Sequence, residues 1–164
     1  MSKVCVVAGV GPGNGASCCR RFAAEGYSIA MLARNTEYLN SLAAEVDNSL
    51  AIACDVRDPK AVVAAFDQIS NELGEVDVLI YNAGSGEWNN VEQTTIEGME
   101  SSWQTNTLGL LVAGQQVIPA MKTKETGQLL LSARQRRCEV VPIRQHSLQR
   151  SRPSAAWPNR WLGA

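Results

Sequence analysis

Glycines gather near the N-terminus, where an apolar segment ends and a helix-like segment begins. Residues 4–8 are apolar, residues 16–25 have a helical pattern, and between them stand four glycines, Gly9, Gly11, Gly13 and Gly15. Glycine lets the backbone approach a phosphate closely, and the N-terminus of the following helix attracts the negative charge. The pattern predicts a strand, a tight turn and a helix that bind the pyrophosphate of a nucleotide. A glycine-rich turn without a ligand is the alternative.

Alternating apolar runs and helical patterns surround this turn. Further strands are expected at residues 28–33, 50–54 and 76–81, and a fifth begins within residues 128–131. Helices are expected at residues 35–46, 59–73 and about 99–121, the second capped by Asp58 and ended by Gly74. This order predicts an α/β fold with a Rossmann-like, doubly wound parallel sheet.

Composition places the chain among ordinary globular proteins. Its 164 residues are 45% hydrophobic and 19% charged, which suits one domain and excludes disordered and fibrous classes. The N-terminus has neither a signal peptide's apolar length nor a membrane span, so we expect a cytoplasmic protein without a membrane partner. The five cysteines are odd in number and lack metal-ligand spacing. We expect small buried thiols, no disulfide framework and no metal site.

The last part of the chain has a different composition. Residues 1–132 hold 8 basic and 15 acidic residues, whereas residues 133–164 hold 7 arginines and one acidic residue. These arginines show no periodicity, and Pro142, Pro153 and Pro158 interrupt any helix. We therefore divide the chain into a nucleotide-binding domain, residues 1–131, and an irregular Arg-rich tail, residues 132–164. Nucleic-acid binding by the tail is a lesser expectation than a solvated tail.

Four motifs in order resemble the short-chain dehydrogenase/reductase family over roughly residues 2–131. The family's T-G-x-x-x-G-x-G appears at residues 8–15, Asp55-Val56 follows the third strand, Tyr81-Asn82-Ala83-Gly84 matches N-N-A-G, and Asn106 matches a conserved helix position. The resemblance implies a nicotinamide dinucleotide cofactor. It assigns cofactor binding to Gly9, Gly11, Pro12, Gly13, Asn14, Gly15, Arg34, Asp55, Val56, Asn82, Ala83 and Gly84.

Three of these positions have more definite implied roles. By the resemblance, Asp55 contacts the adenine amine, and Asn106 is a catalytic residue that organises a water on the proton-relay path. Arg34 follows the second strand, where NAD-selective members carry an acidic residue, and its forked donors suit a 2′-phosphate. NADP is therefore the expected cofactor, with NAD possible. The alternatives are a solvated Arg34, a helix-capping Asp55 and an ordinary polar Asn106.

The family's catalytic pair is missing from this sequence. Family chemistry uses Y-x-x-x-K, in which the lysine charge lowers the tyrosine pKa so that proton transfer runs near neutrality. The residues four positions after the three tyrosines are instead Met31, Leu42 and Ser85. Ser132 lies about two positions early for the family's serine, so we assign it no catalytic role. The chain as written is expected to be inactive, with a sheet incomplete at its C-terminal flank.

A shift of reading frame would explain both the short length and the altered tail. In the shifted frame, each codon consists of the third base of one original codon and the first two bases of the next. Trp157-Pro158 then yields GCC, which encodes alanine, whichever proline codon is used. The same shift over residues 132–163 permits a sequence that resembles the family's fifth strand and catalytic helix. At His146-Ser147 it permits F-x-x-x-K, although not tyrosine. An out-of-frame tail is therefore our hypothesis.

The resemblance implies an NADP-dependent oxidoreductase that transfers hydride between nicotinamide and a carbonyl or alcohol. The small-molecule substrate itself is not indicated, because the family selects substrates with segments absent from this sequence. Family members are typically homo-oligomers. The alternative is a non-catalytic nucleotide-binding protein whose basic tail contacts nucleic acid or a protein partner.

Overall fold

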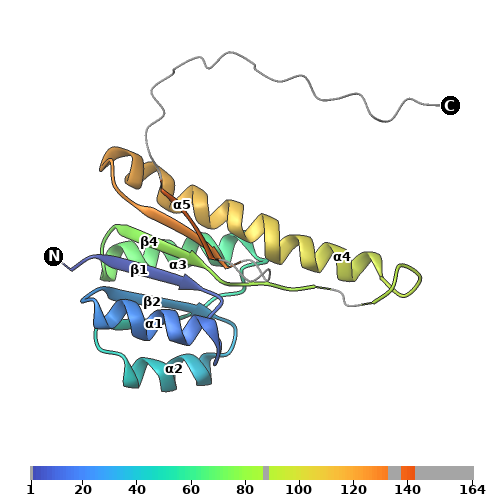
Figure 1. The fold of residues 1–164 in the computed structure, drawn as a ribbon, viewed down its shortest axis with the longest axis horizontal. Coiled ribbons are helices and arrows are strands. Elements are labelled where there is room, and N and C mark those ends of the chain that lie inside the picture. Colours follow the sequence, from blue (N-terminus) through green and yellow to red (C-terminus); the bar gives the residue numbers. More distant parts are fainter. Residues whose placement is uncertain (1, 87–88, 133–137, 143–164) are drawn as a thin grey trace, which may run out of the picture.

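The described residues form one six-stranded sheet flanked by helices (Figure 1). The structure, a computed structural model, describes residues 2–86, 89–132 and 138–142. In chain order the elements are β1 (Val4–Ala8), α1 (Asn14–Ala24), β2 (Ser28–Ala33), α2 (Thr36–Glu45), β3 (Ser49–Ala53), α3 (Pro59–Glu72), β4 (Val76–Tyr81), α4 (Ile96–Trp103), the π-helical turn η1 (Gln104–Leu108), α5 (Gly109–Thr123), β5 (Gln128–Ser132) and β6 (Cys138–Pro142).

The sheet confirms the predicted α/β class. Its strand order is β3-β2-β1-β4-β5-β6, and the first five strands in this order pair in parallel. The chain order reverses between β1 and β4, which is the switch point of a doubly wound sheet. β2 and β4 have the predicted bounds, and β3 and α2 differ from prediction by one residue at each end.

One strand lies in the segment that the sequence analysis expected to be irregular. β6 pairs antiparallel with β5 and takes the edge of the sheet. Its sequence, Cys-Glu-Val-Val-Pro, contains adjacent β-branched residues, which favour a strand. The tail arginines lie in residues 133–137 and 143–164, outside the described residues. So do His146, Ser147, Trp157 and Pro158, on which the frameshift hypothesis rests.

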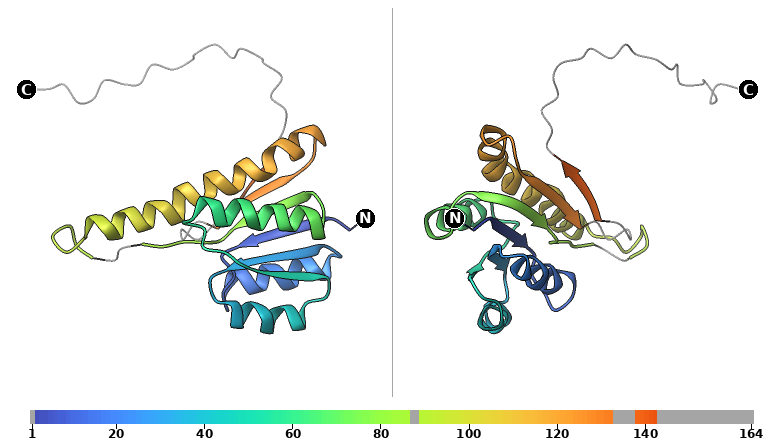
Figure 2. Two further views of the ribbon diagram at one scale, coloured as in Figure 1. Left: turned by 180° about the vertical axis from the view of Figure 1, so that it is seen from behind. Right: turned by 60° about the vertical axis from the view of Figure 1, so that its left-hand side comes forward.

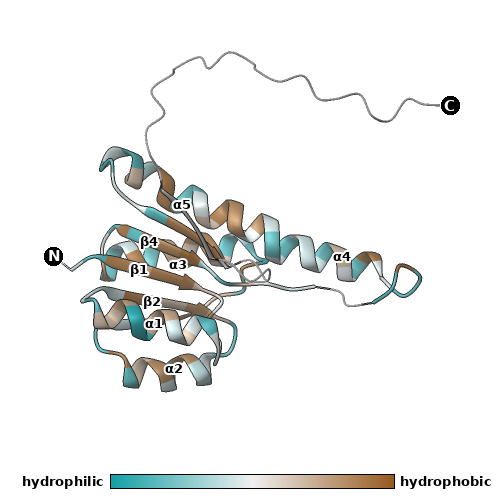
Figure 3. Ribbon diagram, viewed as in Figure 1, coloured by the Kyte–Doolittle hydropathy of each residue, from teal (hydrophilic) through white to brown (hydrophobic). Residues whose placement is uncertain are grey.

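Alternation along the strands divides the core into two layers. On β1, Val4, Val6 and Ala8 face one layer, whereas Cys5 and Val7 face the other. The first layer is covered by buried residues of α3 and α5, and the second by those of α1 and α2. Figure 2 shows helices on both sides of the sheet, and Figure 3 shows its largely apolar strands. Both faces being covered explains the continuous apolar runs in the sequence.

The helical stretch predicted at about residues 99–121 is present in the structure and contains a π-helical turn. α4 and α5 are joined by the π-helical turn η1, and α4 extends beyond the sheet (Figure 1). The buried Tyr81 hydroxyl on β4 donates a 2.5 Å hydrogen bond to the Thr105 carbonyl within η1. Gly109 follows at once, and a Cβ there would collide with the Tyr81 hydroxyl and the Val56 carbonyl. The helix changes geometry where it packs most closely on the sheet.

Candidate nucleotide-binding site

A cleft of about 830 Å³ opens at the carboxyl ends of the parallel strands. Ligands of doubly wound sheets bind at this edge, beside the switch point. The cleft brings together most of the residues predicted to bind a cofactor: Gly9, Gly11, Gly13, Asn14, Gly15, Arg34, Asp55, Val56, Asn82, Ala83 and Gly84. Pro12 and Asn106 are not among the residues that line it. Pro12 lies in the glycine turn, and Asn106 lies on η1 behind the loop that follows β4.

The glycine turn is open toward the cleft, and no side chain caps the helix that follows it. Gly9 has φ +91°, and the N–H groups of Gly9 and Val10 both donate to the Leu32 carbonyl, at 2.8 and 3.0 Å. Gly11 and Gly13 have no atom within 4 Å of an added Cβ, so this side of the turn is open. No side chain caps the N-terminus of α1 at Gly13. Helix N–H groups without a cap and an open turn fit a phosphate group.

Asn82 ties this turn to the end of β4. Its side-chain amide donates to the Gly9 carbonyl at 2.7 Å, and its backbone N–H donates to the Ala8 carbonyl at 2.8 Å. A Cβ on Gly9 would collide with the backbone of Ala83, so the two segments pack in direct backbone contact. The motif after β4 therefore fixes the shape of the glycine turn. This is a contact between two predicted site segments that the sequence did not indicate.

Asn106 holds the loop after β4 from the other side. Its side-chain N–H donates to the Ser85 carbonyl at 2.6 Å, and its side-chain oxygen accepts from the Ser85 N–H at 3.0 Å. These two hydrogen bonds pair the Asn106 side-chain amide with the backbone of Ser85, as two residues pair in a β-sheet. They fix the backbone next to Gly84. The structure thus gives Asn106 a loop-holding contact. The proton-relay role implied by the resemblance remains a prediction.

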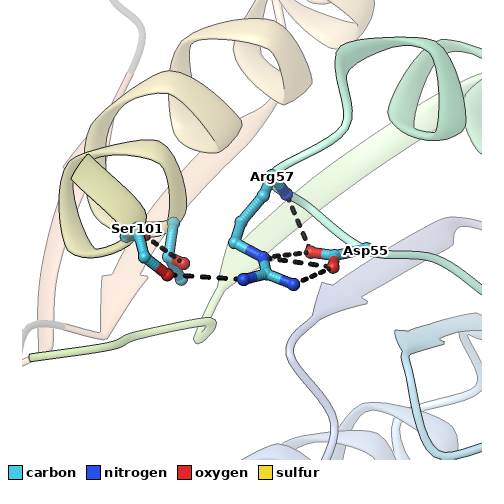
Figure 4. A network of polar contacts seen from close by, with 4 residues as sticks. Asp55, Arg57 and Ser101 are labelled. Atoms are coloured by element: carbon cyan, nitrogen blue, oxygen red, sulfur yellow. Dashed lines mark hydrogen bonds and ion pairs between the residues drawn. The ribbon is translucent and has the colours of Figure 1, made fainter. Parts of the chain in front are cut away.

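Asp55 lies at the end of β3 in a bidentate ion pair with Arg57 (Figure 4). The Arg57 guanidinium reaches across to the Ser101 hydroxyl on α4 at 3.3 Å. Hydrogen bonds from Arg57 hold the pKa of the Asp55 carboxyl below its usual value, although partial burial opposes this shift. The charge of Arg34 also contributes to lowering this pKa. The two arginines therefore both place positive charge near one carboxylate.

Sequence reasoning missed nine of the residues that line the cleft, among them Arg57, Ser85, Ser101 and Thr105. Arg57 follows Asp55 by two positions in the same loop, and this proximity was a usable signal. Ser101 and Thr105 stand one helical turn apart, and the Thr105 hydroxyl donates to the Ser101 carbonyl at 2.9 Å. Their spacing suggests a shared helix face, but not that the face meets the loop after β3.

Within the described residues we also searched for disulfides, metal sites and membrane-spanning helices. Cys5, Cys19 and Cys54 are buried, as predicted, and none of these three forms a disulfide. Across residues 2–86, 89–132 and 138–142, no three metal-ligating side chains gather closely enough to hold an ion. In the same part of the chain, no helix has the length and apolar character needed to cross a membrane.

Comparison with known proteins defines the family. A family model described as short chain dehydrogenase matches residues 3–132. The 3-oxoacyl-(acyl-carrier-protein) reductase of Bos taurus is 33% identical over 131 residues, which make up 79% of this chain and 55% of that protein. The chain therefore belongs to the short-chain dehydrogenase family, as the four motifs predicted. It spans about half the length of the curated relatives it matches.

Solved structures agree with this assignment. An alcohol dehydrogenase from the archaeon Thermococcus sibiricus, complexed with 5-hydroxy-NADP, is 26% identical with a TM-score of 0.75, covering 80% of this chain and 57% of that one. The L-sorbose reductase of Gluconobacter frateurii, complexed with NADPH and L-sorbose, is 25% identical with a TM-score of 0.75, covering 80% and 52%. The matched part carries the cleft, because the site residues lie within residues 9–106.

Proposed function

We propose that this chain carries the cofactor-binding half of an NADP-dependent oxidoreductase that interconverts a carbonyl and an alcohol. The observation that carries the proposal is the cleft itself: an open glycine turn, an uncapped helix N-terminus and Arg34 share one cavity at the switch point. Related structures with NADP-type ligands support it. When bound, the nicotinamide dinucleotide supplies or accepts the hydride.

Different residues of the cleft bind different parts of the cofactor. The N–H groups at the start of α1 bind the pyrophosphate, since they face the cleft without a capping side chain. Arg34, exposed at the end of β2, binds the 2′-phosphate through its forked donors. Asn82 and Asn106 act as positioning residues, because each holds a backbone segment of the cleft wall by hydrogen bonds.

We further propose that the chain as written binds cofactor without turnover. The absence of Y-x-x-x-K from the sequence supports this. The hypothesis of an out-of-frame tail is tested on the DNA that encodes residues 122–164. One inserted or deleted base that restores F-x-x-x-K or Y-x-x-x-K supports it, and neighbouring frames closed by stop codons would exclude it. A cytoplasmic location and a homo-oligomeric state also remain proposals.

Binding of NADPH and NADH by the purified chain tests the cofactor proposal. We expect NADPH to bind about tenfold or more tightly than NADH, the effect of one charge-assisted contact to a phosphate. Arg34→Gln should bring the two dissociation constants within about threefold. Arg21→Gln is the matched control, because Arg21 lies exposed on α1 in an ion pair with Glu25 and does not line the cleft. Equal binding of both nucleotides by the unmodified chain would exclude NADP selectivity, and no binding would exclude the cofactor site.

A further inference from the structure

The carboxylate of Asp55 is held by one neighbour and has room for one more donor. The Arg57 backbone N–H donates to one of its oxygens at 3.0 Å, and Nη2 donates to the other at 2.6 Å. The Nε N–H lies between the two oxygens, at 3.1 Å from each. These three N–H groups use three of the about four acceptor positions of a carboxylate. Within the described part of the chain, the remaining position is open to a ligand, because Asp55 is 32% exposed and lines the cleft.

Arg57 is itself anchored on a second element of the cleft. Its Nη1 donates to the Ser101 hydroxyl on α4 at 3.3 Å (Figure 4). The pairing with Asp55 spans only two positions of one loop, so closing this contact costs little chain entropy. The guanidinium therefore joins the loop after β3 to α4 and holds the carboxylate in one orientation between them.

This anchoring changes what a ligand must do to reach the carboxylate. Without a partner, an aspartate side chain turns about two bonds, and its carboxylate is hydrated where it is exposed. A ligand that donates to it must then displace water and stop the rotation, and both requirements weaken binding. In the pair, the N–H groups of Arg57 have already replaced that water and fixed the direction of the remaining lone pair. The carboxylate is therefore ready to accept a hydrogen bond.

Arg57 also has an opposing effect on Asp55. Its positive charge reduces the strength with which the carboxylate attracts a further donor. This effect is small here, because the two side chains are 32% and 38% exposed and water screens their charges. A hydrogen bond from a neutral donor depends strongly on its direction. The fixed orientation therefore outweighs the shared charge.

We propose that Arg57 is a positioning residue that holds the Asp55 carboxylate ready to accept the 6-amino group of the cofactor's adenine. The proposal rests on the proposed cofactor function and deepens it, because it assigns recognition of the base to a pair of side chains. Its first consequence is a preference for adenine over hypoxanthine, which carries an accepting 6-oxo group in place of the amine. Its second is that this preference requires the forked guanidinium of Arg57.

Two ligands that differ in the purine base test the proposal. Dissociation constants are measured for NADPH and for its hypoxanthine analogue with the full chain. We expect NADPH to bind about tenfold more tightly, the effect of one hydrogen bond to a charged group. In Arg57→Gln the two constants should agree within about threefold. The ratio of the two constants cancels any general effect of the lost positive charge on the phosphates.

Arg57→Lys separates the fork from the charge. A lysine keeps the positive charge but lacks the planar pair of donors that fixes both oxygens. We expect its two constants also to agree within about threefold. Thermal unfolding checks that each variant is folded, and Arg57→Lys decides if Arg57→Gln is not.

Lys60→Gln is the matched control. It removes the same unit of charge as Arg57→Gln from the same region, at an exposed position of α3 that does not line the cleft. Its ratio should remain that of the unmodified chain. Loss of the preference in both Arg57 variants, but not in Lys60→Gln, supports the proposal.

The other outcomes separate this proposal from the cofactor site. Equal binding of both nucleotides by the unmodified chain would overturn the role of Arg57 and leave the cofactor site standing. A preference for adenine that persists or grows in either Arg57 variant would do the same. Failure of both nucleotides to bind any of the folded proteins would overturn the cofactor site and, with it, the role of Arg57.

Discussion

At the scale of single residues, Gly9 is the most constrained position in the site. It combines φ +91° with a backbone packed directly against Ala83. Two independent features disfavour a side chain at this position. The positive φ is strained for residues other than glycine, and the backbone of Ala83 occupies the place of a Cβ. The shape of the glycine turn therefore depends on the absence of a Cβ atom at Gly9.

Gly9→Ala should lower the free energy of unfolding by about 3–5 kcal/mol, since backbone strain and a collision with Ala83 add. Urea denaturation measures this loss. Gly11→Ala is the control in the same turn, because its φ is not in the left-handed range and no atom lies within 4 Å of the added Cβ. Its loss should stay within about 1 kcal/mol. Equal losses in both variants would contradict the packing argument.

The buried thiols should be unreactive in the native protein. Burial raises the pKa of Cys19 to about 12 and that of Cys54 to about 11, and it raises the pKa of Cys5 further. Only the thiolate attacks a disulfide reagent. In a Cys18→Ser/Cys138→Ser variant, labelling at about pH 8 should be at least about 100-fold slower in buffer than in denaturant. Rapid labelling in buffer would show that the two core layers open readily.

The sequence predicted which residues gather at the cleft better than it predicted their contacts. Asp55 was identified from its place in a motif, but its pairing with Arg57 depends on how a loop side chain folds back. Asn106 was likewise identified, while its pairing with Ser85 was not, because an amide can bond to any nearby backbone group. Motifs locate functional positions along the chain, and the fold alone decides which of them meet.

At the scale of elements, the first five strands and the long helical stretch followed prediction, whereas β6 and the π-helical turn η1 were not predicted. Apolar runs end sharply at polar residues, so β2 and β4 were readily bounded. Residues 99–121 keep a helical pattern throughout, and nothing in that pattern marks the π-helical turn. The interruption lies beside a tertiary hydrogen bond from Tyr81 to Thr105, a partner 24 positions away.

Tyr81→Phe tests whether this bond maintains η1. Burial raises the pKa of Tyr81, so its hydroxyl stays protonated and donates at neutral pH. Removing it leaves the Thr105 carbonyl without this donor, at an expected cost of about 1–3 kcal/mol. Amide hydrogen exchange should quicken across residues 104–109. Tyr27→Phe is the control, because the ring of residue 27 keeps its edge contact with Phe22. Unchanged exchange in η1 would contradict this role.

At the scale of the whole molecule, α4 carries an exposed apolar stripe. Ile96, Met99 and Trp103 follow one helical face, and Ile96 is 75% and Trp103 55% exposed. Large apolar side chains in such a row mark a contact surface rather than a solvated face. The part of the chain that the structure describes leaves this stripe uncovered.

We expect copies of the chain to associate through this stripe. Trp103→Glu should raise the dissociation constant of the assembly by about tenfold or more, because a charge would enter the apolar contact. Sedimentation over a range of concentrations measures it. Asn71→Glu adds the same charge at an exposed position of α3 and should leave association unchanged. A monomer at all concentrations, or equal effects of both variants, would contradict the prediction.

The contact between Asn82 and Gly9 also has a consequence for the order of folding. It joins positions 73 residues apart, at the same place where β1 and β4 pair. Closing so long a loop is slow relative to the local β-α-β steps. We therefore expect the glycine turn to acquire its final form only when β1 and β4 pair. During refolding, we therefore expect nucleotide binding to appear later than the circular-dichroism signal of the helices.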